Sequence, residues 1–308
     1  MNKAVVITGG LGFIGRNIAK IFKQNDYYVI GIGHGDINQE SLQSNDFDEW
    51  FQESISIQNL KKIDKKIDTI VHCAGGSTVG ISIAEPYLDY HKTVNSTLEL
   101  LEFIRLHSPN SSLIYLSTAA VYGSKEDLPI KESDTTNPVS PYGFHKLASE
   151  NICKSYAQCF DINVSIVRLF SIYGEGLKKQ LLWEACNKIM QADKKVLFFG
   201  TGNETRDWLH VNDVATLVMK IATTSATNKF QIYNGSVGVR ITVRDILFIL
   251  RDLLGKNEIE IEFNQQYKEG DPQFYLGCTQ KIVGTGWSHT IQIEEGLKKY
   301  VNWYKLTK

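Results

Sequence analysis

Two side chains four residues apart could perform proton chemistry together. Tyr142 and Lys146 lie in the segment SPYGFHKLASE (140–150), where Pro141 occupies a position typical of a helix start. A spacing of four places the phenol and the ammonium group on one face of that helix, one turn apart. The positive charge would favour the phenolate and lower the pKa of Tyr142 toward the range of a useful acid or base. Without further support, such a pair is more often a solvated surface pair.

Two hydroxyl side chains lie upstream, at the end of an apolar run. Ser117 and Thr118 belong to YLSTAAVYG (115–123), and SLIYLS (112–117) is predicted to be a strand. Doubly wound sheets bind their ligands at the carboxyl ends of their strands. A hydroxyl there could hydrogen-bond an oxygen that gains or loses a proton, or it could make only a local turn bond.

A glycine-rich segment at the start of the chain is typical of a phosphate loop. TGGLGFIG (8–15) contains Gly10-x-Gly12-x-x-Gly15, with Gly9 before it, between a predicted strand and a predicted helix. Glycine permits the tight turn and the close approach of backbone to a pyrophosphate, and a helix N-terminus attracts negative charge. The segment therefore predicts a dinucleotide site; the alternative is a glycine turn without a ligand.

The elements that would position these groups alternate along the chain. Short apolar runs predict strands at 4–9, 27–32, 68–75, 112–117 and 164–170, and helical spacing predicts helices at 13–25 and 85–107. In the longer helix Val94, Leu98, Leu101 and Ile104 share one face. This alternation predicts an α/β fold with a doubly wound parallel (Rossmann) sheet.

The pattern loosens beyond about residue 175, which predicts a smaller C-terminal substrate-binding lobe. We assign 1–175 to the dinucleotide-binding domain, with 207–235 returning to it, and 176–206 and 236–308 to the smaller lobe. The lobe contains predicted helices at 181–192 and 243–254 and a hairpin-like piece at 194–202. The earlier segment 36–62 is polar, and only WFQESIS (50–56) could supply a strand there.

Composition and charge narrow the possible partners. The 308 residues carry a formal net charge of −1 without a basic tail or run, which argues against nucleic acid and anionic membranes. No apolar run approaches the roughly 18 residues of a membrane span. The five cysteines are scattered without a CxxC motif and form no cluster with the seven histidines, so no metal site is predicted. No export signal is visible, and a cytoplasmic location is expected.

Several motifs in a fixed order resemble one enzyme family over nearly the whole chain. They are TGGLGFIG (8–15), VHCAGG (71–76), TVNSTLELLE (93–102), STAAVYG (117–123), PYGFHK (141–146), VRLFSIYG (167–174), GTGNETRDWLHVNDVA (200–215) and EGDP (269–272). The chain resembles the extended short-chain dehydrogenase/reductases, specifically the NAD(P)-dependent epimerase/dehydratase group that acts on nucleotide-diphosphate sugars.

The resemblance implies catalytic and cofactor-binding roles. Tyr142 would be the catalytic acid/base, Lys146 would hold the nicotinamide ribose and tune Tyr142, and Thr118 would share the hydrogen bond to the reacting sugar oxygen. The residues expected to bind the cofactor are Gly9, Gly12, Phe13, Ile14, Gly15, His34, Ala74, Gly75, Ser117, Tyr142 and Lys146.

The resemblance also implies where a nucleotide sugar would bind. Arg206, in the pattern G-x-x-x-x-R-D, would contact the diphosphate, unless it forms a structural ion pair with Asp207 or Glu204. Lys268 stands where a second arginine usually precedes G-D, and it would act as a point charge. Ser171 replaces the usual asparagine. The full set expected to bind the substrate is Ser77, Thr118, Ser171, Arg206 and Lys268.

Two alanines bear on the type of reaction. In the family's 4,6-dehydratases the stretch 117–123 carries an Asp and a Glu that move protons, whereas this chain has Ala119 and Ala120. Because alanine cannot transfer a proton, we argue against a dehydratase and against the sugar decarboxylases. A 4-epimerase with one tightly held NAD remains, as does a reductase that exchanges its cofactor.

The segment VIGIGHGD (29–36) bears on the identity of the cofactor. NAD-bound epimerases carry an Asp at the position of Gly33, where it holds the ribose hydroxyls and would repel a 2′-phosphate. Gly33 removes that repulsion, and His34 could donate to the phosphate. No Arg or Lys lies between residues 34 and 60, and Asp36 could reach a ribose. We therefore predict NADP, with NAD as the alternative.

These observations lead to one preferred function and two rivals. The preferred one is NAD(P)H-dependent reduction of a 4-keto group on a nucleotide-diphosphate 6-deoxyhexose, in surface-polysaccharide or O-antigen sugar biosynthesis. The rivals are a nucleotide-sugar 4-epimerase with tightly bound NAD and a non-catalytic dinucleotide-binding sensor. The resemblance implies a homodimer formed through helices near 85–107 and 141–160. We interpret His72 and Cys73 as packing residues and His210 as a structural histidine.

Overall fold

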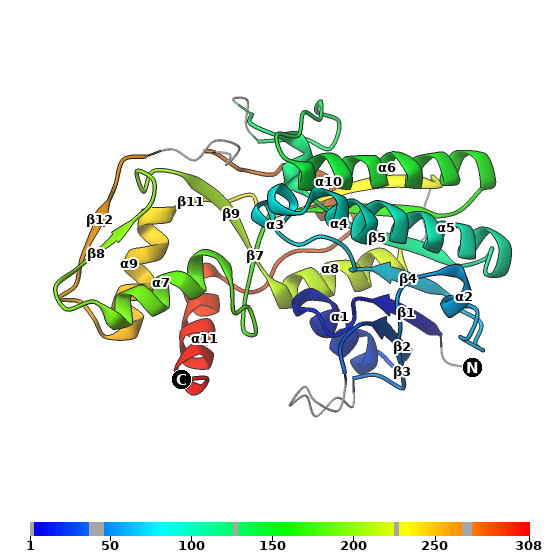
Figure 1. The fold of residues 1–308 in the computed structure, drawn as a ribbon, viewed down its shortest axis with the longest axis horizontal. Helices are drawn as coiled ribbons and strands as arrows, with labels where there is room; N and C mark the ends of the chain where they lie inside the picture. The colour runs from blue at the N-terminus through cyan, green and yellow to red at the C-terminus, as the bar shows by residue number, and fades with distance from the viewer. Residues whose placement is uncertain (1–2, 37–45, 126–128, 225–227, 267–272) are drawn as a thin grey trace.

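A seven-stranded parallel sheet forms the centre of the molecule (Figure 1). The computed structural model describes residues 3–36, 46–125, 129–224, 228–266 and 273–308. The strand order is β10-β6-β5-β4-β1-β2-β3. These strands are β1 (Ala4–Thr8), β2 (Tyr28–Gly33), β3 (Glu49–Gln52), β4 (Thr69–His72), β5 (Ser112–Thr118), β6 (Val164–Leu169) and β10 (Phe230–Gly235). The order reverses between β1 and β4, which is where doubly wound sheets bind ligands.

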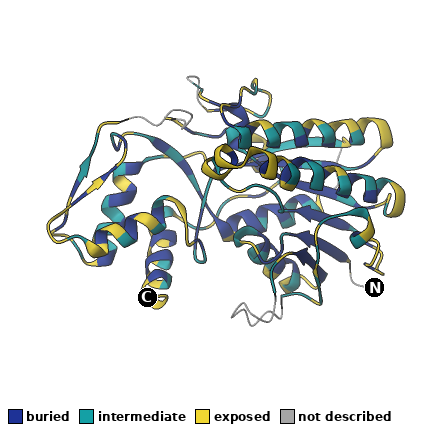
Figure 2. Cartoon of the chain, in the orientation of Figure 1, coloured by how far each residue is buried: buried dark blue, intermediate teal, exposed yellow. Residues whose placement is uncertain are grey.

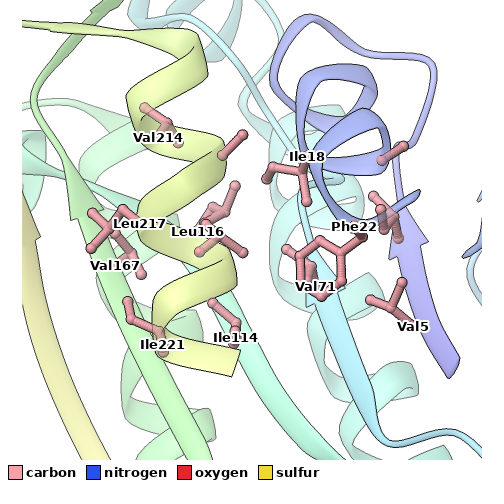
Figure 3. Packing of buried hydrophobic residues seen from close by; sticks show 14 of the residues in the cluster. Val5, Ile18, Phe22, Val71, Ile114, Leu116, Val167, Val214, Leu217 and Ile221 are labelled. Carbon is pink, nitrogen blue, oxygen red and sulfur yellow. The ribbon is translucent and has the colours of Figure 1, made fainter. Parts of the chain in front are cut away.

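Helices cover both faces of this sheet. One face carries α1 (Phe13–Gln24) and α8 (Val211–Thr223), and Figure 3 shows apolar side chains of both helices directed at buried strand residues. The other face carries α2 (Ile57–Leu60), α5 (Ser96–His107) and α6 (Pro141–Phe160). Both faces need cover because parallel strands are apolar on each side, and Figure 2 shows the strands buried and the outer helix faces exposed. The predicted α/β fold with a doubly wound parallel sheet is confirmed.

The helix predicted at 85–107 is built from joined pieces. They are α4 (Pro86–Tyr90), the π-helical turn η1 (His91–Asn95) and α5, and the short helix α3 (Val79–Ala84) precedes them. A π-helical turn inserts an extra residue and rotates the residues that follow. Val94, Leu101 and Ile104 are buried, but Leu98 is 44% exposed and Thr97 is buried instead. The placement of Leu98 on the same face as these three residues is therefore wrong.

The C-terminal part packs around a second apolar core. Its helices are α7 (Gln180–Gln191), α9 (Val243–Leu254) and α11 (Ile293–Leu306). The helices predicted at 181–192 and 243–254 are confirmed. The hairpin-like piece predicted at 194–202 is wrong, because β8 (Lys195–Phe198) pairs in parallel with β12 (Glu260–Phe263). Parallel strands need a long connection, so the partner lies far away in the sequence.

The stretch 207–235 divides between two sheets. β9 (Thr205–His210) lies in a three-stranded sheet between β7 (Ser171–Tyr173) and β11 (Arg240–Thr242), whereas β10 joins the central sheet beside β6. We keep the division of the chain into two domains as a proposal. Two short helical pieces, η2 (Ala119–Tyr122) and α10 (Gln280–Val283), complete the described elements. None of the helices in the described ranges is both long and apolar enough to cross a membrane.

Candidate active site

A large cleft lies along the carboxyl ends of the central strands. Its volume is about 1330 Å³, whereas a pocket for one drug-sized ligand has roughly 300–1,000 Å³. The expected site residues that line it are Gly9, Gly12, Phe13, Ile14, Gly15, His34, Ala74, Gly75, Ser77, Ser117, Thr118, Tyr142, Lys146, Ser171 and Arg206. Lys268 and the motif EGDP lie outside the described residues. The cleft is large enough for a dinucleotide beside a second ligand.

The glycine loop between β1 and α1 forms one end of this cleft. Gly9 has a φ of +64°, and a Cβ at Gly15 would lie 2.4 Å from the Gly9 carbonyl oxygen. A side chain at Gly15 would therefore collide with the backbone. Gly12 is the N-cap of α1, and no described side chain caps this helix end. Its first backbone N–H groups and their partial positive charge are available to a diphosphate, so the loop fits a dinucleotide.

The end of β2 borders the same region of the cleft. Gly33 is the last residue of β2, and the exposed His34 follows it. A Cβ at Gly33 would lie 3.5 Å from the Trp50 ring and 3.6 Å from the Cα of Gly9. These are ordinary van der Waals distances, so the packing does not require glycine at this position.

Thr118, Tyr142 and Lys146 meet where β5 ends and α6 begins. Thr118 is the last residue of β5, and Tyr142 lies in the first turn of α6, at the edge of the cleft. Lys146, one turn further along α6, is 5% exposed and donates from Nζ to the carbonyl oxygen of Leu116 at 3.0 Å. The spacing of four residues has thus placed the phenol and the ammonium group beside the end of one strand.

Removal of water governs the ionisation of these groups. It raises the pKa of Tyr142 above its ordinary value, while a hydrogen bond with Thr118 lowers the pKa and the charge of Asp89 raises it. The expected fall in the pKa of Tyr142 is therefore wrong, because loss of water disfavours the phenolate more than its neighbours favour it. Burial lowers the pKa of Lys146 to about 8, although nearby acidic groups oppose this shift.

A buried ion pair supports this group of residues from behind. Glu150, one turn after Lys146 on α6, accepts hydrogen bonds from Nε and Nη2 of Arg168 at 3.1 and 2.7 Å. Ser117 donates to the same carboxylate at 2.5 Å. Since Arg168 lies on β6 and Ser117 on β5, the pair fixes α6 against both strands. Ser117 lines the cleft while its hydroxyl is held by Glu150.

Three further expected residues line the cleft from separate segments. Ser77 follows β4, Ser171 begins β7, and Arg206 lies on β9. Arg206 donates from Nη1 to the carbonyl oxygen of Thr205 at 3.0 Å. The neighbouring Asp207 accepts hydrogen bonds from three backbone N–H groups at 2.7 to 3.1 Å. Burial raises the pKa of Asp207 to about 6, although these bonds lower it, so Asp207 is a structural carboxylate.

Several residues that line the cleft were not predicted from the sequence. Lys179, the N-cap of α7, donates from Nζ to the hydroxyl of Ser77 at 3.0 Å, which links the C-terminal part to the loop after β4. The η1 residues His91, Lys92 and Asn95 also face the cleft. A π-helical turn has no period that a sequence pattern could reveal. For Lys179, the only sequence feature that could have indicated a place at the cleft is a charged residue between two apolar stretches.

The histidines and cysteines near the cleft have structural surroundings. Thr8 and Thr97 hydrogen-bond the two ring nitrogens of His72, and burial lowers its pKa to about 3, so the ring is neutral. Cys73 packs against the core as interpreted, but it also lines the cleft. His210 caps α8 and lies 3.0 Å from a carboxylate oxygen of Glu175. Within the described part of the chain, no group of three or more His, Cys, Asp or Glu residues could hold a metal ion.

Comparison with known proteins identifies the family. The model described as "NAD dependent epimerase/dehydratase family" matches residues 5–235. The chain belongs to this family. A putative UDP-glucose 4-epimerase of Methanocaldococcus jannaschii is 31% identical over 98% of each chain. A UDP-glucuronate 4-epimerase of Thermodesulfobacterium geofontis is 26% identical over 97% of this chain and 95% of its own.

Solved structures of the family show the same architecture. The UDP-glucuronic acid 4-epimerase from Bacillus cereus, in complex with UDP-glucuronic acid and NAD, matches with a TM-score of 0.88 at 26% identity, covering 99% of this chain and 100% of that chain. The predicted resemblance is confirmed. The protein is an enzyme of this NAD-dependent family, and the sensor alternative is set aside.

Proposed function

We propose that the protein is a nucleotide-sugar 4-epimerase that works with bound NAD. The observation that carries this proposal is one cleft that unites the phosphate loop, the Thr118–Tyr142–Lys146 group and Arg206. Ala119 and Ala120 line the same cleft and offer no acid for a dehydration. Relatives named as 4-epimerases support this function over the keto-sugar reductase preferred from the sequence.

The side chains are suited to oxidation and re-reduction at a single carbon. NAD at the phosphate loop would supply the acceptor, and then the donor, of a hydride at C4 of the sugar. In its phenolate form Tyr142 would take the proton of the 4-hydroxyl during the oxidation, and Thr118 would orient the same oxygen. During the re-reduction from the opposite face of the 4-keto sugar, Tyr142 would give this proton back to the 4-oxygen. The sugar must turn over between these steps, and the volume of the cleft supports this.

The remaining assignments concern the substrate and the partner subunit. Arg206 and Lys268 would neutralise the diphosphate, and Ser77 and Ser171 would contact the sugar. A homodimer is supported by exposed apolar side chains on α3 to α5 and on α6. They include Ile83, Tyr87, Leu98, Leu106, Phe144 and Phe160. The cytoplasmic location and the role in surface-polysaccharide synthesis stay predictions.

A reductase is the second candidate, because one observation favours it. Gly33 lines the cofactor end of the cleft without any packing reason for glycine, and it brings no carboxylate there. The lack of a carboxylate at this position would admit the 2′-phosphate of NADP, and a reductase consumes NADPH in each turnover. The Bacillus cereus structure contains NAD, which favours the epimerase.

The experiment that tests the proposal begins with the purified protein. It is denatured, and any dinucleotide that it releases is identified and quantified. The native protein is then incubated with UDP-glucose and with UDP-glucuronic acid, without added cofactor, and the products are separated by chromatography. Stoichiometric NAD and interconversion of 4-epimers would support the epimerase. An empty protein that binds NADPH and shows no epimerisation until NADPH and a 4-keto sugar are supplied would overturn it.

A further inference from the structure

Asp89 of α4 is a buried carboxylate beside the catalytic group, with no role in the reaction as described so far. It is 2% exposed, and its Oδ2 lies 2.6 Å from Nδ1 of His145. His145 directly precedes Lys146 on α6, and the edge of its ring packs against Tyr90 at 5.4 Å. Asp89 Oδ1 is also buried, and it has no hydrogen-bond partner within the described structure. A carboxylate buried in this way is unfavourable unless a nearby positive charge balances it.

The side-chain ends of Lys146 and Asp89 lie beside two consecutive glycines, Gly75 and Gly76. A Cβ at Gly75 would lie 3.4 Å from Nζ of Lys146, and a Cβ at Gly76 would lie 1.8 Å from Oδ1 of Asp89. Oγ1 of Thr93 is 3.4 and 3.2 Å from these two positions, so both lie on the same side of the loop. The ammonium group and the carboxylate therefore lie beside adjacent residues of one loop, Lys146 next to Gly75 and Asp89 next to Gly76.

The acidic groups that face Lys146 differ in their charge. They are Cys73 at the end of β4, Asp89 on α4, and Glu150 and Cys153 on α6. Glu150 is already neutralised by Arg168. Burial raises the pKa of both thiols, that of Cys73 to about 12, so they are uncharged at neutral pH. Of the four, Asp89 alone remains as a negative charge that no arginine neutralises.

The other faces of Lys146 offer no negative charge. The ring of Tyr115 on β5 lies 4.9 Å from Nζ, and burial raises the pKa of that phenol well above its ordinary value. His72 of β4 is neutral. Tyr142 hydrogen-bonds Thr118, and the charge of Asp89 raises its pKa. Asp89 thus acts on both the lysine and the tyrosine.

We propose that Asp89 is a positioning residue that provides the counter-charge for Lys146, and that His145 holds Asp89 in place through its hydrogen bond. Asp89 keeps the buried ammonium group protonated at neutral pH. It thereby sets the range of pH over which Tyr142 exchanges a proton with the substrate. This inference rests on the roles proposed above for Tyr142 and Lys146.

Removing the charge of Asp89 should shift the ionisation of both residues in one direction. The negative charge raises the pKa of Tyr142 and of Lys146, so Asp89→Asn should lower both. Both limbs of the profile of kcat against pH should move toward lower pH by about one pH unit, which is a typical effect of removing one nearby charge. A purely structural role would lower kcat without moving the limbs.

The test compares Asp89→Asn with Asp213→Asn. Asp213 is another buried aspartate, 1% exposed, which accepts hydrogen bonds from Thr290 and Ile291 on the opposite side of the sheet. We would measure kcat against pH and also titrate Tyr142 by NMR in protein labelled with 13C at tyrosine Cζ, using Tyr142→Phe for assignment. We expect the midpoint of the Tyr142 titration to be about one pH unit lower in Asp89→Asn than in the wild type, and unchanged in Asp213→Asn. An unchanged midpoint in Asp89→Asn would overturn the inference.

The NMR titration needs no substrate, so it remains informative if no nucleotide sugar is turned over. Should Asp89→Asn fail to fold, His145 offers a second test. His145→Phe removes the hydrogen bond that holds the carboxylate in place, so Asp89 can turn away from Tyr142, and the midpoint of Tyr142 should move in the same direction as in Asp89→Asn. His145→Gln retains a donor and should restore the wild-type midpoint. Equal midpoints for the Phe variant and the wild type would contradict the proposal.

Discussion

Replacing Lys146 with methionine should stabilise the protein at neutral pH while it destroys the proposed activity. Lys146 is 5% exposed, and burial lowers the pKa of its ammonium group from 10.5 to about 8. This difference corresponds to about 3 kcal/mol by which folding disfavours the charged lysine. Between pH 8 and 10.5 the unfolded chain binds more protons than the folded chain, so the stability of the wild type rises with pH across this range. Methionine carries no charge and removes this dependence.

A lost hydrogen bond opposes the gain. Nζ of Lys146 donates to the carbonyl oxygen of Leu116, and that buried oxygen would be left unpaired at a cost of about 1–3 kcal/mol. The net gain in the free energy of unfolding at pH 7 should therefore be at most about 2 kcal/mol. The way in which the stability difference between variant and wild type changes with pH is the better test, because the cost of the lost hydrogen bond does not depend on pH. From pH 7 to 9.5 the advantage of the methionine variant should shrink by about 2 kcal/mol.

Urea unfolding of nucleotide-free protein at pH 7 and at pH 9.5 measures this quantity directly. Lys154→Met is the matched control, since Lys154 is exposed on the same helix and its replacement should leave the pH dependence of the wild type intact. If the stability of Lys146→Met runs parallel to that of the wild type between the two pH values, the buried lysine titrates normally. That result would refute a lowered pKa for Lys146.

Three further substitutions probe separate parts of the cleft. Tyr142→Phe removes the transferable proton, so kcat should fall by at least about 10²-fold while the content of bound dinucleotide is retained; unchanged turnover would exclude Tyr142 as the acid/base. Gly33→Asp should fold normally, because a Cβ there would lie 3.5 Å or more from its neighbours. Equilibrium binding should show at least about a tenfold rise in the preference for NAD over NADP, or about 1.4 kcal/mol. An unchanged preference would show that Gly33 does not determine the choice of cofactor. Glu150→Gln leaves the buried Arg168 without its counter-ion, so urea unfolding should show a loss of about 3–5 kcal/mol, and a loss below 1 kcal/mol would show that the ion pair is dispensable.

Local patterns predicted much of the cleft. The glycine loop, the strand that ends in Ser117 and Thr118, and the four-residue spacing of Tyr142 and Lys146 are each set by a few neighbouring residues. Because parallel strands present their carboxyl ends at one edge, such local segments come together once the sheet forms. The order of these segments along the chain supported the family resemblance.

Other features depend on contacts or surroundings that short patterns do not contain. The π-helical turn at η1 moved Leu98 out of the buried face, and an insertion of this kind has no periodic signal. The pairing of β8 with β12 joins segments about sixty residues apart. The pKa of Tyr142 rises because of burial, which the spacing to Lys146 could not reveal.

The glycines around the cleft separate what the fold requires from what a ligand requires. A Cβ at Gly15 would lie 2.4 Å from a backbone oxygen, and one at Gly76 would lie 1.8 Å from Asp89, so these glycines are needed for packing. Gly33 is different, because a Cβ there would meet nothing closer than 3.5 Å. The packing would accept a Cβ at Gly33, so we attribute this glycine to the choice of cofactor. Since the roles proposed for Thr118, Tyr142 and Lys146 suit an epimerase and a reductase equally well, the two proposals differ at the cofactor end of the cleft.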